Sequence, residues 1–198
     1  MNETVKPGLL RRLWQTLNKP SAKYSILALS GSAFIGGILF WGAFNTGMEA
    51  TNTIAFCTGC HEMRDNVYQE YKGTIHDSNR TGVRAICSDC HVPKDWIHKI
   101  GRKIQASNEV FHWIAGTVDT KAKFEDHRME LAQHVWKTMK DSNSRECRNC
   151  HAFETMKASK QSPRAQKNHA QAQVEGKTCI DCHKGIAHLL PREYNEDE

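Results

Sequence analysis

The chain has 198 residues, of which 39% are hydrophobic and 25% are charged, and a formal net charge of +5. This length suits one domain of ordinary size. Because its apolar residues are few, we expect a group other than amino-acid side chains to fill part of the core of that domain. Five of the 27 basic and one of the 22 acidic side chains precede Phe44, so the charge of the remainder is almost balanced and argues against nucleic-acid binding.

The first feature along the chain is a basic segment followed by an uncharged apolar run. The run, residues 24–44, is long enough to cross a bilayer, which takes about 20 apolar residues. Because basic residues stay on the cytoplasmic side, we expect residues 1–23 in the cytoplasm, 24–44 as a single anchor in the cytoplasmic (inner) membrane, and 45–198 in the periplasm. The cations before the run are Lys6, Arg11, Arg12, Lys19 and Lys23.

A cleaved signal peptide is the alternative for this run. We favour a retained anchor, because the run is long for a signal peptide and no clear small-residue cleavage site follows it. The small residues Ser32, Ala33, Gly36 and Gly37 could pack the helix against a copy of itself or a partner. Ordinary tolerance of glycine in membrane helices explains them equally well, so a homo-oligomer stays an open interpretation.

All cysteines of the chain fall into four copies of one pentapeptide, Cys-x-x-Cys-His. Two thiols at this spacing can form thioethers with the vinyl groups of one haem, and the adjoining imidazole can bind its iron. We number the motifs 1 to 4 along the chain and predict four covalently bound haem c groups. The residues are Cys57, Cys60 and His61; Cys87, Cys90 and His91; Cys147, Cys150 and His151; and Cys179, Cys182 and His183.

A lone Cys-x-x-Cys pair could instead be a zinc half-site or a redox pair. The histidines discriminate, because four unrelated pairs would all be followed by His with a chance of roughly one in 100,000. Four haems also supply the missing apolar core, and their attachment requires a compartment outside the cytoplasm. Their propionates would make the exported domain acidic.

The spacing of the motifs indicates the organisation of this domain. Cys57 and Cys87 are 30 residues apart, Cys147 and Cys179 are 32 apart, and 60 residues separate the two pairs. Residues 122–140 have helical periodicity, and no hairpin signals intervene. We expect an all-α protein, in which one N-terminal transmembrane helix precedes a haem-packed, mostly helical domain with two dihaem modules.

Histidines outside the motifs could bind iron on the side opposite the motif histidines, but four haems need at most four such distal ligands. His76 and His188 stand out because each follows a motif at short range. His127 and His134 share a helical face, which is the only argument for them. The histidines outside the motifs are His76, His98, His112, His127, His134, His169 and His188.

Longer stretches around these motifs resemble the NapC/NirT family of membrane-anchored multihaem quinol dehydrogenases. The stretches are KPGL near the start, FWGAFNTGME at 40–49, CHEMR from Cys60, CHVP from Cys90 and CIDCHKGIAH from Cys179. The resemblance covers almost the whole chain. It implies that membrane quinol, menaquinol or ubiquinol, is oxidised at haem 1, and that four haems relay the electrons to a periplasmic partner such as nitrate reductase or its cytochrome subunit.

The resemblance also implies the iron ligands. Distal imidazoles would come from His76 for haem 4, His188 for haem 3 and His169 for haem 2. In a structurally known relative, the methionine matching Met63 binds the iron of haem 1 in place of the motif histidine. Family members without this methionine exist, so His61 stays open as the ligand.

A quinol site is expected along residues 94–115, where Trp96, Ile97, Ile100 and Ile104 form an apolar stripe among basic residues. Such a helix suits the membrane interface, although it could equally pack on a haem. The resemblance implies that Lys103 and Glu109 act on the quinol beside haem 1. Glu109 is one methylene longer than the Asp of many relatives, and both residues could instead be solvated helix charges.

Two other functions remain open at this point. The chain could be a membrane-anchored electron carrier without a quinol site of its own, or a terminal multihaem reductase. Nothing in it resembles the lysine-substituted haem motif of nitrite-reducing enzymes. A quinol dehydrogenase needs a base beside haem 1, because quinol loses two protons along with two electrons while each haem accepts one electron.

Overall fold

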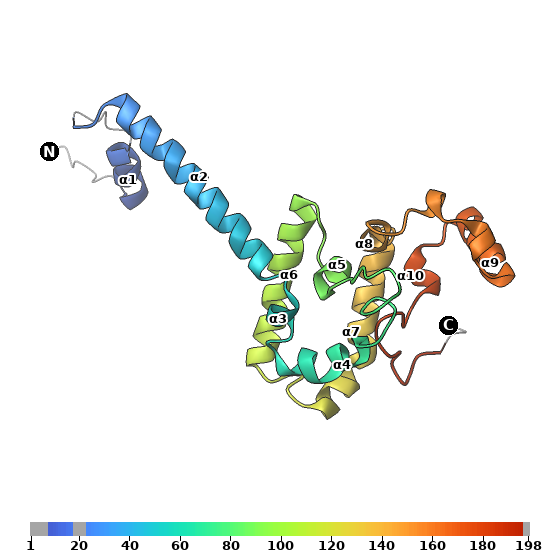
Figure 1. Ribbon diagram of the computed structural model, residues 1–198. Helices are drawn as coiled ribbons and strands as arrows, with labels where there is room; N and C mark the ends of the chain where they lie inside the picture. Colours follow the sequence, from blue (N-terminus) through green and yellow to red (C-terminus); the bar gives the residue numbers. More distant parts are fainter. Residues whose placement is uncertain (1–7, 18–22, 196–198) are drawn as a thin grey trace. The chain divides into compact units, whose positions relative to one another are not determined.

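The computed structural model describes residues 8–17 and 23–195, and every regular element in these ranges is a helix (Figure 1). The prediction of an all-α protein is therefore confirmed. The chain divides between Met48 and Glu49 into two compact units, which are described separately below.

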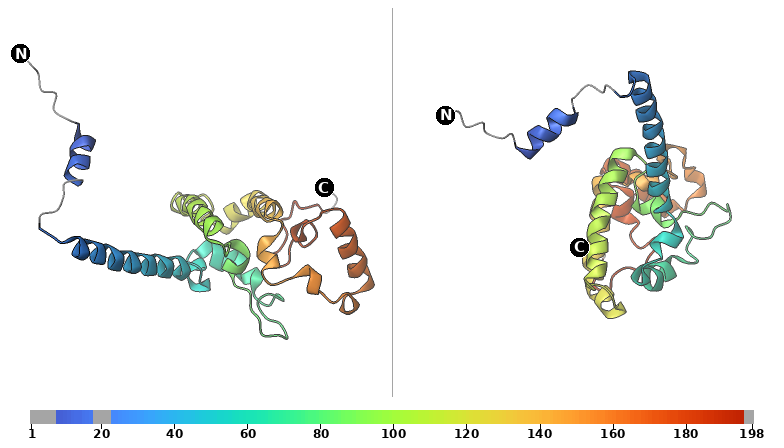
Figure 2. Two further views of the ribbon diagram at one scale, coloured as in Figure 1. Left: turned by 90° about the horizontal axis from the view of Figure 1, so that it is seen from above. Right: turned by 90° about the vertical axis from the view of Figure 1, so that its left-hand side faces the viewer.

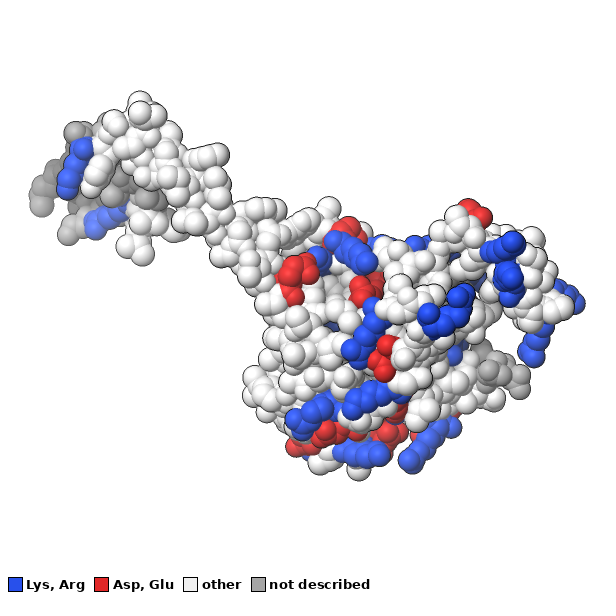
Figure 3. All heavy atoms as spheres, in the orientation of Figure 1, with Lys and Arg blue, Asp and Glu red and all other residues white. Residues whose placement is uncertain are grey.

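The N-terminal unit holds α1 (Leu9–Leu17) and most of α2 (Ile26–Ala50). Within the described residues, α2 is the one helix long and apolar enough to cross a membrane, and none of its residues is buried. The rod that it forms shows almost no charged atoms (Figure 3). The helix α1 was not predicted; it gathers Leu9, Leu10 and Leu13 on one face, as interfacial helices do.

The helix α2 continues past Phe44, the end of the predicted membrane run. Its polar residues there bond to carbonyls one turn earlier: Asn45 Nδ2 donates to Trp41 O at 2.8 Å, and Thr46 Oγ1 donates to Gly42 O at 2.9 Å. The helix accommodates these polar side chains within its own turns and extends to Ala50.

The second unit contains two long helices and several short ones. In Figure 1 and in the left view of Figure 2, α9 lies at the end of this unit away from α6. Its α-helices are α3 (Ile54–Cys57), α4 (Tyr68–Tyr71), α5 (Cys87–His91), α6 (Trp96–Ile114), α7 (Lys121–Asp141), α8 (Arg145–Arg148), α9 (Pro163–Val174) and α10 (Cys179–Cys182). A π-helical turn covers Met63–Val67, and 3-10 turns cover Phe153–Thr155 and Ala158–Lys160.

Side-chain caps and a glycine set the bounds of the long helices. Asp95 Oδ1 accepts from His98 N at 3.1 Å before α6, and Thr120 Oγ1 accepts from Lys123 N at 3.3 Å before α7. Gly116, with φ +67°, lets the chain leave α6 through the left-handed region. The predicted helices at 94–115 and 122–140 therefore form almost as expected.

The apolar core of the second unit is small. Among the described residues only Tyr71, Phe124 and Ile180 are buried apolar side chains. The short motif helices instead pack on one another or on a long helix: α5 contacts α3 and α8, and α10 contacts α7. The polypeptide thus encloses a space that its own side chains do not fill.

Candidate haem-binding site

A large cavity occupies the interior of the second unit. Its volume is about 2190 Å³, and all eight motif cysteines line it. Pockets for drug-sized ligands are smaller, about 300–1,000 Å³. None of the described cysteines forms a disulfide, so each motif presents two free thiols to the cavity.

The motifs follow one another along the cavity wall. The thiols of Cys57 and Cys87, from motifs 1 and 2, lie within hydrogen-bonding reach of each other. Motifs 2 and 3 meet where α5 contacts α8. Motif 4 is tied to motif 3 by Ser144, whose fully buried Oγ accepts from Ile180 N at 3.1 Å.

Three pairs of imidazoles face each other across the cavity. The ring centres are 6.2 Å apart for His76 and His151, 6.3 Å for His91 and His188, and 5.9 Å for His169 and His183. A metal–imidazole bond is about 2 Å long, and the ring centre lies about 1 Å beyond the nitrogen, so two imidazoles on one metal ion have centres about 6 Å apart. Each pair is therefore spaced to hold one iron.

These pairs differ from the pairing that the family resemblance implied. His76 lies opposite the histidine of motif 3, not motif 4, and His188 lies opposite that of motif 2, not motif 3. His169 lies opposite the histidine of motif 4, not motif 2. The three distal candidates are thus brought to the cavity as expected, but each faces a different motif from the one predicted.

Two distal candidates are oriented by hydrogen bonds from Nδ1. His188 Nδ1 is 3.2 Å from Val67 O, and His169 Nδ1 is 2.8 Å from Gln161 Oε1. With these oxygens as acceptors, Nδ1 carries the proton and Nε2 is left with the lone pair that binds a metal. His76 Nδ1 is buried without a partner.

Burial keeps several of these imidazoles neutral, the form that binds iron. It lowers the pKa of His91 to about 4 and also lowers the pKa of His76, His183 and His188. A protonated imidazole has no lone pair to offer. The cavity therefore selects the ligating form of these side chains at neutral pH.

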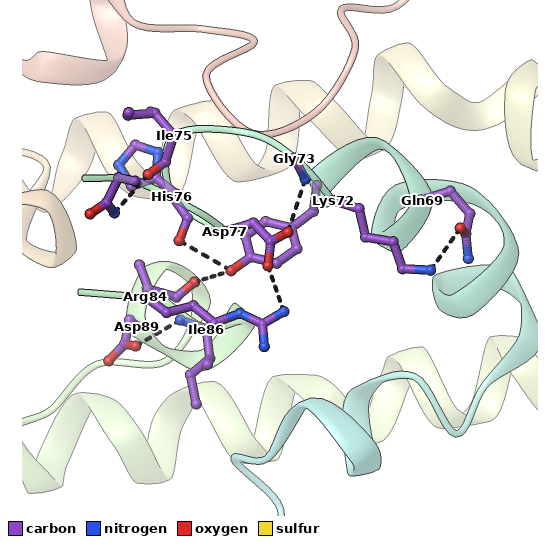
Figure 4. A network of polar contacts seen from close by, with 12 residues as sticks. Gln69, Lys72, Gly73, Ile75, His76, Asp77, Arg84, Ile86 and Asp89 are labelled. Carbon is purple, nitrogen blue, oxygen red and sulfur yellow. Dashed lines mark hydrogen bonds and ion pairs between the residues drawn. The ribbon is translucent and has the colours of Figure 1, made fainter. Parts of the chain in front are cut away.

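The loop that carries His76 is fixed by polar contacts (Figure 4). Tyr71 Oη donates to Ala85 O at 2.6 Å, and Ala85 N donates to His76 O at 3.0 Å. Asp77 accepts from Gly73 N at 2.9 Å and pairs with Arg84 at 2.5 Å. These contacts hold His76 in place from both of its sides along the chain.

Motif 1 differs from the others in its axial candidates. Met63, at the start of the π-helical turn, lines the cavity, whereas His61 does not. The His61 side chain is 47% exposed, and its Nε2 lies 3.2 Å from Glu62 Oε1. This placement favours Met63 over His61 as the group that faces the cavity.

Glu62 is a buried acid that the sequence analysis did not single out. The residue is 5% exposed and lines the cavity, and neither of its carboxylate oxygens accepts a hydrogen bond from the described residues. Its contact with His61 is an ion pair only when that imidazole is protonated. The one sequence feature that could have drawn attention to Glu62 is its position directly between the motif histidine, His61, and Met63.

The remaining histidines do not pair with a second imidazole within the described part of the chain. His98 Nδ1 lies 2.6 Å from Asp95 Oδ1, outside the cavity. His112 Nδ1 lies 3.1 Å from Thr117 Oγ1, and His127 Nδ1 lies 2.9 Å from Lys123 O. With His134 these last two line the cavity without facing another imidazole among the described residues, although the ring centre of His112 lies 5.7 Å from that of Phe111.

Lys103 and Glu109 both line the cavity, but they do not meet. Lys103 Nζ donates to Asn52 Oδ1 at 2.6 Å and to Thr51 Oγ1 at 2.7 Å, beside motif 1. Burial lowers the pKa of Lys103. Glu109, with a side chain that is 62% exposed, instead pairs with Arg102 at 2.7 Å on another face of α6.

The residues present fit four c-type haems. The cavity is large, each motif offers two thiols to it, and three imidazole pairs are spaced for iron. Few apolar side chains are buried in this unit, and four flat, apolar haems in the cavity would complete its core.

Comparison with known proteins gives consistent matches. Residues 19–193 match the model of the NapC/NirT cytochrome c family, N-terminal region. The chain is 54% identical to cytochrome c-type protein NapC of Escherichia coli strain K12, over 96% of this chain and 94% of that protein. It is 52% identical to the denitrification system component NirT of Stutzerimonas stutzeri, over 100% and 96%. A putative tetraheme cytochrome-c type protein of Allochromatium vinosum is 49% identical, over 86% and 92%. No solved structure matches.

Proposed function

Because the chain belongs to the NapC/NirT cytochrome c family, and is thus an electron-transfer cytochrome, we propose that it is a quinol dehydrogenase. In this proposal it oxidises membrane quinol beside motif 1 and delivers the electrons to a periplasmic reductase. The similarity to NapC and NirT favours a partner of nitrate respiration or denitrification, such as nitrate reductase or its cytochrome subunit.

The observation that carries the proposal is the environment of Lys103. This partly buried ammonium lies on the cavity wall beside motif 1, held by Thr51 and Asn52. These two residues directly follow α2, the candidate membrane span, which ends at Ala50. A quinol that reaches the cavity from the membrane surface would therefore meet Lys103 near motif 1.

Lys103 and Glu109 have complementary roles in this proposal. Quinol gives up two protons and two electrons, and removal of each proton leaves negative charge on a quinol oxygen until the electron follows. Lys103 would hydrogen-bond that oxygen and stabilise the charge. Glu109 would accept the proton after exchanging its pairing with Arg102, and its exposure gives the proton a path to water.

The helix α6 supports entry of quinol from the lipid. Ile97, Ile104 and Phe111 recur every seven residues along it, and all three are exposed. Lys99, on the adjoining face, pairs with Glu49 at 2.7 Å. An exposed apolar stripe next to basic side chains suits a helix in the membrane interface.

The proposal includes a topology. Residues 1–23 would lie in the cytoplasm, 24–44 in the membrane and 45–198 in the periplasm, because the cations before α2 oppose translocation. The observed α2 is consistent with a single-pass anchor. A homo-oligomer through the small residues of α2 stays within the proposal as an untested feature.

The haem ligands in this proposal follow the geometry of the cavity. Thioethers would form at the eight motif cysteines. His91 and His188, His151 and His76, and His183 and His169 would bind iron in pairs, and Met63 would serve motif 1 in preference to His61. When bound, the haems supply one-electron acceptors, which amino-acid side chains lack.

A quinol assay tests the proposed function against a carrier without a quinol site. The purified full-length protein in mild detergent is mixed with a water-soluble menaquinol or ubiquinol analogue, and haem reduction is followed by absorbance. We expect reduction well above the rate of the uncatalysed reaction. Reduction by dithionite alone, with no response to either quinol, would favour the anchored electron carrier.

Replacing Met63 tests the assignment at motif 1. We expect Met63→Leu, which keeps the size but removes the sulfur, to abolish the methionine-to-iron charge-transfer band of one oxidised haem. Magnetic circular dichroism measures this band, and Met129→Leu is the control because that methionine does not line the cavity. A wild-type protein without the band, or a variant that keeps it, would return the assignment to His61.

A further inference from the structure

The segment that carries His188 has no helix of its own to fix it. The chain continues past α10 to the end of the described residues without another helix. The ring of His188 is oriented by one hydrogen bond, from Nδ1 to Val67 O at 3.2 Å. A bond at the ring does not fix the backbone on either side. The segment is also held further along by Tyr194, whose ring centre lies 5.3 Å from that of Trp136, so the contacts nearest to His188 are the ones that bear on its position.

The nearest such contacts are made to the peptide groups of the next residue, Leu189. Glu70 of α4 accepts from Leu189 N at 3.0 Å, and Arg128 of α7 donates to Leu189 O at 2.7 Å. The Leu189 side chain itself is 69% exposed. The backbone, and not the side chain, is therefore what the domain holds at this position.

The two residues that hold this backbone also bind each other. Arg128 Nη1 donates to Glu70 Oε1 at 2.8 Å, and Nη2 donates to Oε2 at 2.6 Å. This is the bidentate arrangement in which a guanidinium and a carboxylate bond most strongly. Arg128 is 7% exposed, so loss of Arg128 would leave the Glu70 carboxylate without its bidentate partner. Loss of Glu70 would leave Arg128 with Glu125 as its remaining carboxylate partner, at 3.1 Å.

We propose that Glu70 and Arg128 are positioning residues, which hold His188 opposite His91 through the backbone of Leu189. The inference rests on the proposed role of His188 as an iron ligand. The pair joins α4, α7 and the C-terminal segment at one point. Loss of the pair should weaken the binding of His188 to the iron about tenfold. This is the usual lower bound for the loss of a group that orients a metal ligand.

The test compares Glu70→Gln and Arg128→Met in the haem-loaded, full-length protein. Glutamine is uncharged and has an amino group in place of one carboxylate oxygen, so it cannot accept from both nitrogens of Arg128. Methionine at position 128 keeps a similar volume without donors. Cyanide competes with His188 for the iron, and we expect the cyanide concentration that converts half of one haem to its cyanide form to fall at least tenfold in both variants. Electron paramagnetic resonance should show the low-spin signals of the other haems unchanged. His188→Ala identifies the affected haem, as the one whose low-spin signal it removes.

Two matched controls separate positioning from general packing. Leu189→Ala leaves the peptide groups in place, and Glu125→Gln alters the partner that contacts Arg128 at 3.1 Å without touching Leu189. Both should keep the wild-type cyanide midpoint. Partial recovery in Arg128→Lys, which restores one donor, would support the same conclusion.

Three outcomes would overturn the inference. If His188→Ala leaves every low-spin signal intact, His188 is not a ligand and the proposed ligand set fails with it. If that variant loses one signal but Glu70→Gln and Arg128→Met keep the wild-type midpoint, only the positioning role fails. Equal disturbance of all haems would mean that the pair stabilises the domain as a whole.

Discussion

Replacing His76 with alanine will convert one of four haems from low spin to high spin and leave the others unchanged. The distal imidazole is lost, so the iron has an open coordination position. The spacing of 6.2 Å between the rings of His76 and His151 assigns this change to the haem of motif 3. Electron paramagnetic resonance of the oxidised protein measures it.

The same change at the two other distal candidates should act on different haems. His188→Ala is expected to affect the haem of motif 2, and His169→Ala that of motif 4. The assignment can be checked by removing one attachment site at a time. In a protein that lacks Cys147 and Cys150, for example, His76→Ala should produce no further high-spin signal.

Histidines that face no second imidazole provide the controls. His98→Ala and His112→Ala should leave the spectrum intact, because their rings bond to Asp95 and Thr117. A high-spin signal produced by His127→Ala or His134→Ala would show that the imidazole pairs do not define the ligand set.

The second large effect concerns Lys103. We expect Lys103→Leu to lower quinol oxidation about tenfold or more, the usual scale for a positioned acid or base. The ammonium that Thr51 and Asn52 hold beside motif 1 is then absent, and nothing stabilises the charge on the quinol oxygen. Steady-state turnover with a quinol analogue measures the effect, with haem content and dithionite-reduced spectra unchanged.

Lys99→Leu is the matched control for Lys103→Leu. Lys99 lies one turn earlier on α6, contacts Glu49 and does not line the cavity. Its replacement should leave turnover close to that of the wild type. Glu109→Gln should also lower turnover about tenfold if its carboxylate accepts the proton. Normal turnover in both Lys103→Leu and Glu109→Gln would exclude this quinol site.

Features that depend on a few neighbouring residues could be predicted from the sequence alone. The four Cys-x-x-Cys-His motifs identify haem attachment, because one haem needs two thiols and an imidazole within five residues. The helices around 94–115 and 122–140 follow from periodicity and from nearby caps at Asp95 and Thr120. The candidate membrane helix was placed by its apolar length, but its continuation to Ala50 runs through polar residues that apolar length does not predict.

Only the tertiary structure decided which groups face each other. His76 and His151 lie in separate parts of the sequence, and no periodicity relates them, so their pairing depends on the path of the loop that Tyr71 and Arg84 fix. Glu70, Arg128 and Leu189 are likewise distant in sequence and were not predicted to meet. The motifs determine where haem is attached, because that chemistry is local, whereas the second axial ligand must come from wherever the folded chain brings an imidazole within reach of the iron.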